Sequence, residues 1–304
     1  MSIYLPGNHC SLTDLEPFYT VDIIITDIDG TVVSGKKPVI QQIKKTIKRL
    51  QNQGIGISIA TGRTLIGVKQ IVQDLGIQFG MPIALYNGGV ILENNTENIL
   101  YTNTFWGKEI IPIIDRLNGS CGCINMYSCD INHDAFRNSE NDRIIEEVFT
   151  TGINKGRFDI NGMKIQELNV NKIEKKRFVS ALVEKKGIKK DIVFAIEDYI
   201  RNSEVLDYTD SGSGYIEIRG RNSNKGLLIN KIKEQKRFPS NRVLAIGDND
   251  NDLELFANAD ISVAVGNSSF NAVEAADYIC NGNNAEGFLD MLYTIQNARR
   301  YLGG

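Results

Sequence analysis

The stretch DIIITDIDGT, residues 22–31, places a short run of β-branched apolar residues directly before two carboxylates, Asp27 and Asp29. Such a run is typical of a buried strand in a parallel sheet. Residues i and i+2 of an extended chain point to the same side, so these two carboxylates should lie together. Because open α/β sheets build their sites at the carboxyl ends of strands, the stretch predicts a functional site. The two carboxylates repel each other unless a cation neutralises them or one of them keeps its proton.

Alternating helix and strand patterns surround this stretch and predict the fold class. Apolar residues have helical spacing over 38–52 and 64–75, and buried strands are predicted over 22–26, 54–60 and 83–86. The alternation returns towards the C-terminus, with strands predicted at 242–246 and 261–265 and helices at 224–235, 251–257, 269–276 and 286–300. This alternation predicts an α/β fold whose core is a doubly wound, Rossmann-like parallel sheet.

The segment between these two halves has a different character. From residue 87 to about residue 214, short predicted strands (89–92, 99–103, 123–127 and 179–183) mix with helices and with polar loops rich in Asn, Lys and Gly. We therefore predict a core made of residues 1–86 and 220–304, interrupted by an inserted α/β cap domain over residues 87–219.

Two further motifs stand at predicted helix starts. Thr61-Gly62-Arg63 puts a hydroxyl and backbone N–H groups before a helix, an arrangement that binds phosphate oxygens. On its own it is equally consistent with a helix N-cap and a glycine turn. Lys225 lies where a helix dipole disfavours a cation, which indicates an anion nearby. A solvated lysine is the alternative.

The last motif, GDNDND at residues 247–252, follows a predicted buried strand. Asp248 and Asp252 are four residues apart and share a face if a helix begins here. Carboxylate oxygens favour a hard cation such as Mg²⁺. An EF-hand loop is excluded because no glutamate falls at its twelfth position. The alternative is an acidic capped turn.

Composition narrows the class of protein. The 304 residues carry a net charge of −3 and no long basic block, which argues against nucleic acid or an anionic membrane as a partner. The first 20 residues lack a secretory signal pattern and no apolar run is long enough for a membrane span, so a cytoplasmic protein is expected. An odd number of scattered cysteines favours reduced thiols over disulfides or zinc: Cys10, Cys121, Cys123, Cys129 and Cys280. His9 and His133 are expected at the surface.

Together, and in this order, the four motifs resemble those of the haloacid dehalogenase superfamily, specifically its Cof-type subfamily with a class IIB cap. The resemblance covers nearly the whole chain beyond about residue 20. Tyr86-Asn87-Gly88-Gly89 resembles the hinge into the cap, and the stretches 263–267 and 275–278 resemble the C-terminal signature. Two departures, the 20 residues before the first strand and Asn224 where Ser or Thr is common, do not touch the chemistry.

The resemblance implies a magnesium-dependent phosphomonoester hydrolase that acts on small phosphorylated metabolites, with sugar phosphates as the expected class. Asp27 would attack phosphorus and form an aspartyl-phosphate, and Asp29 would act as general acid and then as general base. Thr61 and Lys225 would hold the phosphoryl oxygens. The other expected substrate contacts are Gly62, Arg63, Asn87 and Asn251. The expected Mg²⁺ ligands are Asp27, the backbone carbonyl of Asp29, Asp248 and Asp252.

By the same resemblance, the inserted domain would close over the site and supply specificity, with hinges near Asn87–Gly88 and Gly214–Gly220. Its candidate substrate contacts are Tyr127, Lys164 and Arg219. A homodimer is left open. Two other functions are also left open: a phosphomutase that transfers the phosphoryl group to a second sugar hydroxyl, and a catalytically silent binding or sensor protein. The silent alternative predicts loss of the motif carboxylates or of the motif lysine, all of which are present.

Overall fold

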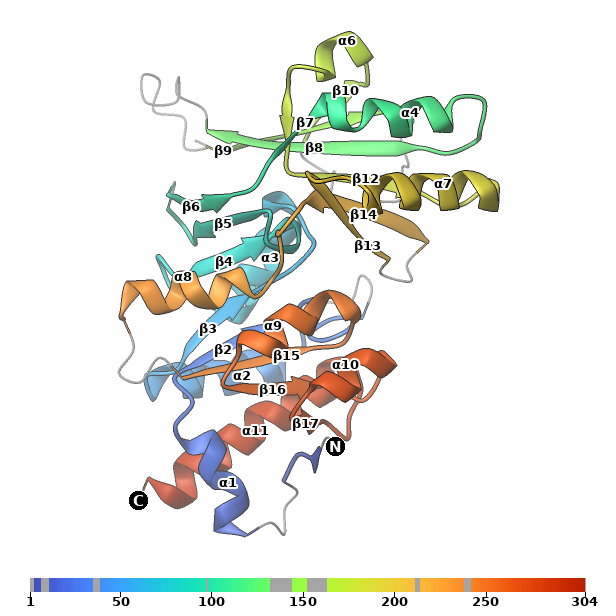
Figure 1. The fold of residues 1–304 in the computed structure, drawn as a ribbon. Coiled ribbons are helices and arrows are strands. Elements are labelled where there is room, and N and C mark those ends of the chain that lie inside the picture. Colours follow the sequence, from blue (N-terminus) through green and yellow to red (C-terminus); the bar gives the residue numbers. More distant parts are fainter. Residues whose placement is uncertain are drawn as a thin grey trace, which may run out of the picture.

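The structure is a computed structural model, and it describes residues 3–6, 11–34, 39–96, 98–131, 144–151, 163–210, 214–237 and 242–303. Three residues named above, His9, Cys10 and His133, lie outside these ranges. The chain forms a core and a cap that stand one above the other (Figure 1).

The core is built on a six-stranded parallel sheet, as the alternation predicted. Its strand order is β1-β17-β16-β15-β2-β3. The strands are β1 (Ile3–Tyr4), β2 (Ile23–Thr26), β3 (Gly56–Ile59), β15 (Val243–Gly247), β16 (Ile261–Ala264) and β17 (Tyr278–Ile279). Strands β2, β3, β15 and β16 are buried along their whole length, which is why they read as continuous apolar runs.

The strand order creates a switch point between β2 and β15. From β2 the chain moves to β3 on one side, whereas from β15 it moves to β16 and β17 on the other side. The connections therefore diverge and leave a crevice at the carboxyl ends of these two neighbours. The first and last sequence motifs follow β2 and β15 directly, so the fold brings them together although they are far apart in the chain.

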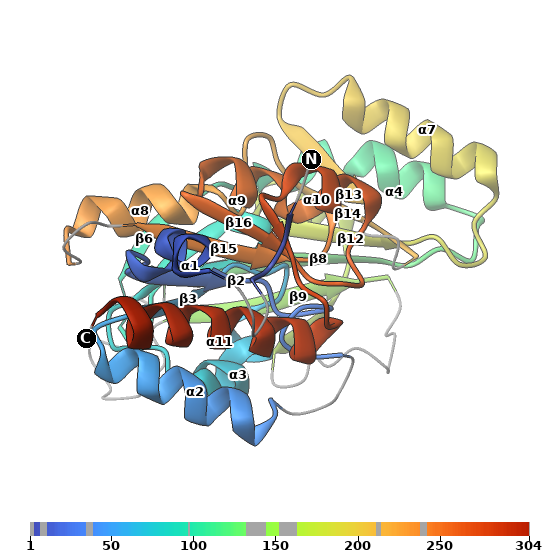
Figure 2. The same ribbon diagram turned by 90° about the horizontal axis from the view of Figure 1, so that it is seen from below.

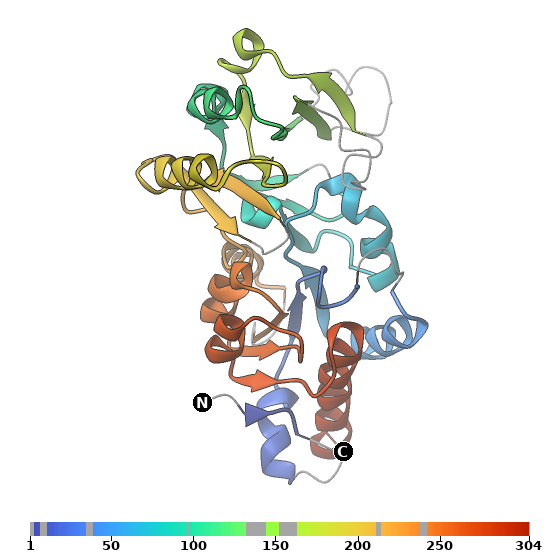
Figure 3. The same ribbon diagram turned by 90° about the vertical axis from the view of Figure 1, so that its right-hand side faces the viewer.

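Helices cover both faces of the core sheet (Figures 2 and 3). One face carries α2 (Gln41–Asn52), α3 (Leu65–Leu75) and α11 (Asn284–Leu302), and the other carries α8 (Leu227–Gln235), α9 (Leu253–Asn258) and α10 (Phe270–Ala275). The predicted spacing in α2 is confirmed, because Ile43, Ile47 and Leu50 are its buried face. Helix α9 begins at residue 253 rather than 251, since a 3₁₀ turn over Asp250–Asp252 precedes it.

The N-terminal residues extend the core. Strand β1 pairs with β17 at the sheet edge, and α1 (Leu12–Tyr19) packs against α11. Phe18 is fully buried, with its ring centroid 4.9 Å from that of Tyr278. This segment therefore covers the end of the sheet that lies away from β3.

Past β3 the sheet changes direction. Strand β4 (Pro82–Leu85) meets β3 through a parallel bridge between Ala60 and Ala84, and β5 (Val90–Glu93) and β6 (Ile99–Thr102) continue it antiparallel. The buried residues of β5 belong to the core's apolar cluster. Residues 90–92 therefore pack with the core, and Phe105 belongs to the cap's own apolar cluster.

The cap is a second six-stranded sheet, with strand order β10-β9-β8-β12-β14-β13 and all pairs antiparallel except β9–β10. Its strands are β8 (Ile124–Ile131), β9 (Ile144–Thr150), β10 (Lys164–Glu167), β12 (Ser180–Glu184), β13 (Leu206–Asp210) and β14 (Tyr215–Gly220). A short ribbon of β7 (Phe105–Trp106) and β11 (Arg177–Phe178) and the turn η2 (Gly107–Glu109) accompany it. Its helices are α4 (Ile111–Leu117), α6 (Val170–Ile173) and α7 (Lys190–Arg201).

The two faces of the cap sheet have different neighbours. Helices α4 and α7 lie along one face (Figure 1), where Ile124 and Met126 of β8 join the cap's own apolar cluster. Tyr127, which alternates with them, belongs instead to the core's cluster. Because side chains alternate along a strand, the second face of the cap sheet looks towards the core.

The chain makes two sharp turns beside the cap, which are called crossings below. At the first, Tyr86, Asn87 and Gly88 all have positive φ (52°, 52° and 85°), which turns the chain sharply between β4 and β5. A Cβ at Gly88 would come within 2.0 Å of the Asn224 carbonyl oxygen, so only glycine fits. The second hinge was predicted near Gly214–Gly220, and residues 215–220 form β14. The chain returns to the core after it, over residues 221–224, where Asn222 has φ +70°.

Among the residues described, no helix is both long and apolar enough to cross a bilayer.

Candidate active site

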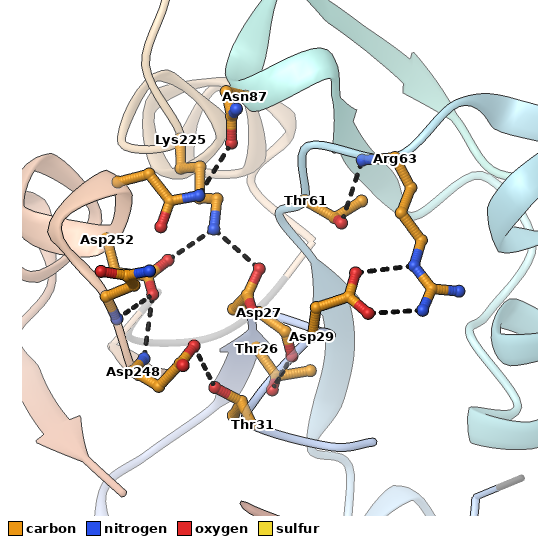
Figure 4. A network of polar contacts seen from close by, with 12 residues as sticks. Thr26, Asp27, Asp29, Thr31, Thr61, Arg63, Asn87, Lys225, Asp248 and Asp252 are labelled. Carbon is orange, nitrogen blue, oxygen red and sulfur yellow. Dashed lines mark hydrogen bonds and ion pairs between the residues drawn. The ribbon is translucent and has the colours of Figure 1, made fainter. Parts of the chain in front are cut away.

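Asp27 and Lys225 meet at the centre of the crevice (Figure 4). Asp27 follows β2 and is 5% exposed, and Lys225 is fully buried just before α8. The Lys225 Nζ donates to Asp27 Oδ1 and to Asp252 Oδ1, each at 2.7 Å. Lys225 therefore links the first and last motifs, and the solvated alternative for this lysine is excluded.

Asp252 organises the loop after β15. Its Oδ1 accepts from Lys225, while its Oδ2 accepts the backbone N–H groups of Asp248 at 2.9 Å and Asn249 at 3.1 Å. Both oxygens of this fully buried carboxylate are thus engaged by the protein. Asp250 points elsewhere, since it accepts from Ser269 Oγ at 2.6 Å and from Asn271 on α10. Only two of the three aspartates of the motif therefore face the crevice.

Asp248 faces Asp27 from the end of β15. Its Oδ1 accepts a hydrogen bond of 3.3 Å from the Thr31 hydroxyl. Gly30 has φ +89°, and a Cβ there would come within 2.2 Å of Asp248 Oδ2. The glycine of the first motif is required because the loop after β2 and the Asp248 carboxylate approach this closely.

These carboxylates form a group that could hold a metal ion. Asp27, Asp248 and Asp252 each offer an oxygen, and these oxygens lie within 4.8 Å of one another. An all-oxygen set suits a hard divalent cation. Since both oxygens of Asp252 already accept hydrogen bonds, Asp27 and Asp248 are the better ligands, and Asp252 positions them through the loop and Lys225.

Burial and neighbouring charges shift the pKa values of the site residues. Burial raises the pKa of Asp27, and the ammonium of Lys225 opposes that rise. Burial also raises the pKa of Asp248 to about 6, and the charge of Asp252 adds to the rise. Burial alone would lower the pKa of Lys225, but Asp252 and Asp27 outweigh it and hold this pKa above its usual value. The site thus gathers three carboxylates around one ammonium, an arrangement in which a bound metal cation would relieve the repulsion between the carboxylates.

Asp29 takes a different environment although it is two residues from Asp27. Its side chain is 52% exposed and forms a two-bond ion pair with Arg63, whose Nε and Nη2 donate at 2.7 and 2.6 Å. Arg63 therefore relieves the repulsion between Asp27 and Asp29 that was expected from the sequence. The predicted substrate contact Arg63 lies in the site, but its guanidinium is engaged by Asp29.

The Thr61-Gly62-Arg63 motif lines the crevice from the end of β3. Thr61 is buried, and its hydroxyl accepts the Arg63 backbone N–H at 3.2 Å. The N-cap of α3 is Thr64, whose hydroxyl accepts from the Gly67 N–H at 2.9 Å. The N-cap alternative for Thr61 is thereby excluded, because the helix starts three residues later.

Asn87 joins the hinge to both sides of the site. Its Nδ2 donates to Glu217 Oε2 on β14 at 2.9 Å, and its Oδ1 accepts from Asn251 Nδ2 at 3.1 Å. A small cavity of about 30 Å³ lies beside these hydrogen bonds. It is located between Gly62 of the core and Tyr127, Ser180 and Glu217 of the cap.

Of the three cap contacts predicted, Tyr127 lines this cavity. Lys164 pairs instead with Glu147 at 2.9 Å, and Arg219 pairs with Asp207 at 3.1 Å. The sequence did not indicate Glu217 as a site residue. The alternation of apolar and polar residues in β14 assigns its side chains to two faces of the strand but does not show which face lies against the core.

Glu146 on β9 is a second buried cap residue that the sequence did not indicate. It is 5% exposed, and its carboxylate accepts the backbone N–H groups of Leu65 at 2.7 Å and Ile66 at 2.9 Å, together with the Tyr86 hydroxyl. A cap carboxylate thus satisfies the free N–H groups at the start of core helix α3. Burial raises its pKa, and the hydrogen bonds oppose the rise.

Comparisons with known proteins show the family and the fold of the chain. The sequence model of the family of haloacid dehalogenase-like hydrolases matches residues 24–292. A 5-amino-6-(5-phospho-D-ribitylamino)uracil phosphatase of Bacillus subtilis is 24% identical over 267 residues, which cover 88% of this chain and 92% of that protein. A phosphoglycolate phosphatase of Methanobrevibacter smithii is 23% identical over 270 residues, covering 88% and 95%. The solved structure of a sugar phosphatase of HAD subclass IIB has the same fold, with a TM-score of 0.68, 17% identity, and coverage of 93% and 99%.

Proposed function

The chain belongs to the family of haloacid dehalogenase-like hydrolases, as its motifs predicted, and from this membership we propose a Mg²⁺-dependent phosphatase of small phosphorylated metabolites. Phosphatase activity is common to the named relatives, one of which acts on a ribityl phosphate and another on phosphoglycolate. Within that activity, we propose phosphate esters of sugars or sugar alcohols as the substrate class. Four described cysteines carry free thiols, which suits a reducing cytoplasm.

The single observation that carries the proposal is the buried Asp27–Lys225–Asp252 chain beside Asp248. A carboxylate oxygen of Asp27 attacks phosphorus, the bond from phosphorus to the ester oxygen breaks, and an aspartyl-phosphate results. Lys225 and Thr61 hold the phosphoryl oxygens. The ammonium of Lys225 also offsets their charge as negative charge shifts towards the leaving group. Water then attacks phosphorus, releases inorganic phosphate and regenerates the Asp27 carboxylate.

Asp27 and Asp248, with the backbone carbonyl of Asp29, would hold the metal. When bound, Mg²⁺ supplies positive charge that offsets the repulsion between the nucleophile and the anionic ester. Asp252 keeps the loop after β15 and the Lys225 ammonium in register with this group.

Asp29 is the proposed general acid and base. It lies at the solvent side of the site and pairs with Arg63. To protonate the leaving oxygen, Asp29 must leave this ion pair and gain a proton. To accept a proton from the attacking water, it must be ionised again.

Access depends on the cap. A cavity of about 30 Å³ holds about one water molecule, whereas metabolite pockets measure about 300 Å³ or more. We propose that the cap lifts away from the core to admit a substrate, and that closure then excludes water from the reacting atoms.

The test is phosphate release from a panel of phosphorylated metabolites and an aryl phosphate, with Mg²⁺ or with EDTA, for wild type and Asp27→Asn. We expect Mg²⁺-dependent release that falls by at least about 10³-fold in Asp27→Asn, because the nucleophile is lost. Thermal unfolding of the variant checks that it is folded. Accumulation of a bisphosphate or a sugar-phosphate isomer in place of free phosphate would replace hydrolysis with phosphomutase activity. Absence of turnover on every compound would overturn the enzyme proposal.

A further inference from the structure

The cavity between core and cap lies where the leaving group of a phosphate ester would go. On the core side it is lined by Gly62, which directly follows Thr61, and by Thr64 and Tyr86. The cap wall comes from the face of the cap sheet that looks towards the core. If Thr61 holds the phosphoryl group, the leaving group of an ester lies next to these lining residues once the cap has lifted to make room for it.

The lining of the cavity is rich in hydroxyls and contains one carboxylate. The hydroxyl-bearing residues are Thr64, Tyr86, Tyr127 and Ser180, and the carboxylate is that of Glu217. No described residue of the lining carries a positive charge. The described cations nearby are paired, Lys225 with Asp27, Arg63 with Asp29 and Arg219 with Asp207.

Glu217 is held in place from the core side. Asn87 donates to Glu217 Oε2, and Asn251 donates to Asn87 in turn. Asn87 is in the left-handed region (φ 52°, ψ 41°) within the first crossing, and Gly62 lies beside its amide. The neighbours Ile216 and Ile218 are fully buried in the cap's own cluster and fix the opposite face of β14. The carboxylate is thus a positioned feature of the cavity.

We propose that Glu217 determines specificity, by accepting hydrogen bonds from a leaving group that carries hydroxyls or amines and by repelling one that carries a carboxylate. The inference rests on the proposed function and narrows its substrate class to phosphate esters of neutral polyols or amino-polyols. Two like charges about 5 Å apart in a partly buried site repel strongly enough to change binding by tenfold or more.

A purely structural role for Glu217 makes a different prediction. If it only held Asn87 and the hinge, its loss would slow the reaction of every ester by a similar factor. A specificity role changes the ratio between two esters that differ in charge. The ratio therefore separates the two roles.

The experiment compares glycerol 3-phosphate with 3-phosphoglycerate, which share a three-carbon skeleton but release a neutral and an anionic leaving group. We expect the kcat/KM of wild type to favour glycerol 3-phosphate by at least about tenfold and Glu217→Gln to reduce that ratio by about tenfold. Glu174→Gln, at the exposed end of α6, removes the same charge far from the cavity and should leave the ratio unchanged. An unchanged ratio in Glu217→Gln, or a wild-type preference for 3-phosphoglycerate, would overturn the inference.

A binding measurement separates this inference from the proposed reaction. Titration calorimetry of both esters into Asp27→Asn and into Asp27→Asn/Glu217→Gln needs no turnover. If wild type hydrolyses neither ester but Asp27→Asn prefers glycerol 3-phosphate and loses the preference with Glu217→Gln, the proposed hydrolysis fails and the inference stands. If wild type hydrolyses both while Glu217→Gln leaves the binding preference unchanged, hydrolysis stands and the inference fails. If neither ester binds preferentially, the inference also fails.

Discussion

The core side and the cap side of the site are built from different chemistry. On the core side, charged groups at strand ends are paired with one another, as in the contacts of Lys225 with Asp27 and Asp252 and of Arg63 with Asp29. On the cap side, Tyr127, Ser180 and Glu217 project from strands of a sheet face and offer hydroxyls and a carboxylate.

This difference has a structural reason. The core groups stand in loops whose backbone is fixed by close approaches, such as that of Gly30 to Asp248, so a change in one disturbs the others. The cap groups alternate with residues buried on the opposite face of their strands, so one can change without disturbing the sheet hydrogen bonds. The residues of the proposed phosphate chemistry thus lie in an interlocked region, and those of the proposed leaving-group contacts lie in a replaceable one.

The largest effect should come from breaking the core side with Lys225→Met. Two buried carboxylates then lose their shared cation, which should cost about 3–5 kcal/mol of unfolding free energy. Phosphate release should fall by about 10²–10³-fold, because charge on the phosphoryl oxygens is no longer offset. Denaturant unfolding and initial rates measure the two losses. Wild-type turnover in this variant would contradict the role assigned to the lysine.

Glu146→Gln tests how the cap is held on the core. A neutral amide cannot accept both backbone N–H groups, so we expect a loss of about 1–3 kcal/mol of unfolding free energy. Denaturant unfolding of wild type and variant measures it. Glu146→Asp, which keeps the charge but shortens the reach, is the companion variant. If neither substitution changes stability, the contact does not hold the cap.

The same glutamate predicts a pH dependence. Burial holds the pKa of Glu146 above its ordinary 4.5, against the opposing effects of the Tyr86 hydroxyl, two backbone N–H groups and the ammonium of Lys69. The folded protein therefore binds this proton more tightly than the unfolded chain, and the resulting stability is lost as the pH rises through the raised pKa. The stability difference between wild type and Glu146→Gln should be larger at about pH 4.5 than at pH 7. An equal difference at both would contradict the raised pKa.

Arg63→Lys should have a smaller effect. Lysine replaces two parallel bonds to Asp29 by one, at a carboxylate that is half exposed. We expect less than about 1 kcal/mol of lost stability and turnover within about tenfold of wild type, measured as above. A loss of stability and turnover as large as that of Lys225→Met would show that the core side depends on this ion pair as much as on Lys225.

The smallest effect should come from Lys231→Met, a matched control on α8. Lys231 pairs with Glu234 at 2.9 Å on the surface of that helix. Such pairs contribute about 0.5 kcal/mol or less, so unfolding and turnover should stay near wild type. A larger loss would show that methionine on this helix harms the protein by itself.

The sequence predicted the core well and the cap less well. Buried parallel strands such as β2 and β15 are recognised because their apolar runs are continuous. Strands β1 and β17 have two residues each, too few for any periodicity. In the cap, strands were predicted over residues 123–127 and 179–183, near β8 and β12, but no strand was predicted for the β14 segment.

By itself, the sequence determined which carboxylates, hydroxyls and lysine stand at strand ends and helix starts, because those positions depend on neighbours in the chain. Only the tertiary structure decided how they pair. Lys225 reaches Asp27 across 198 residues, and Asp29 turns to Arg63 rather than to its neighbour. The positions of Glu146 and Glu217 depend on how the cap sheet lies over the core, and the local spacing of residues carries no information about that packing.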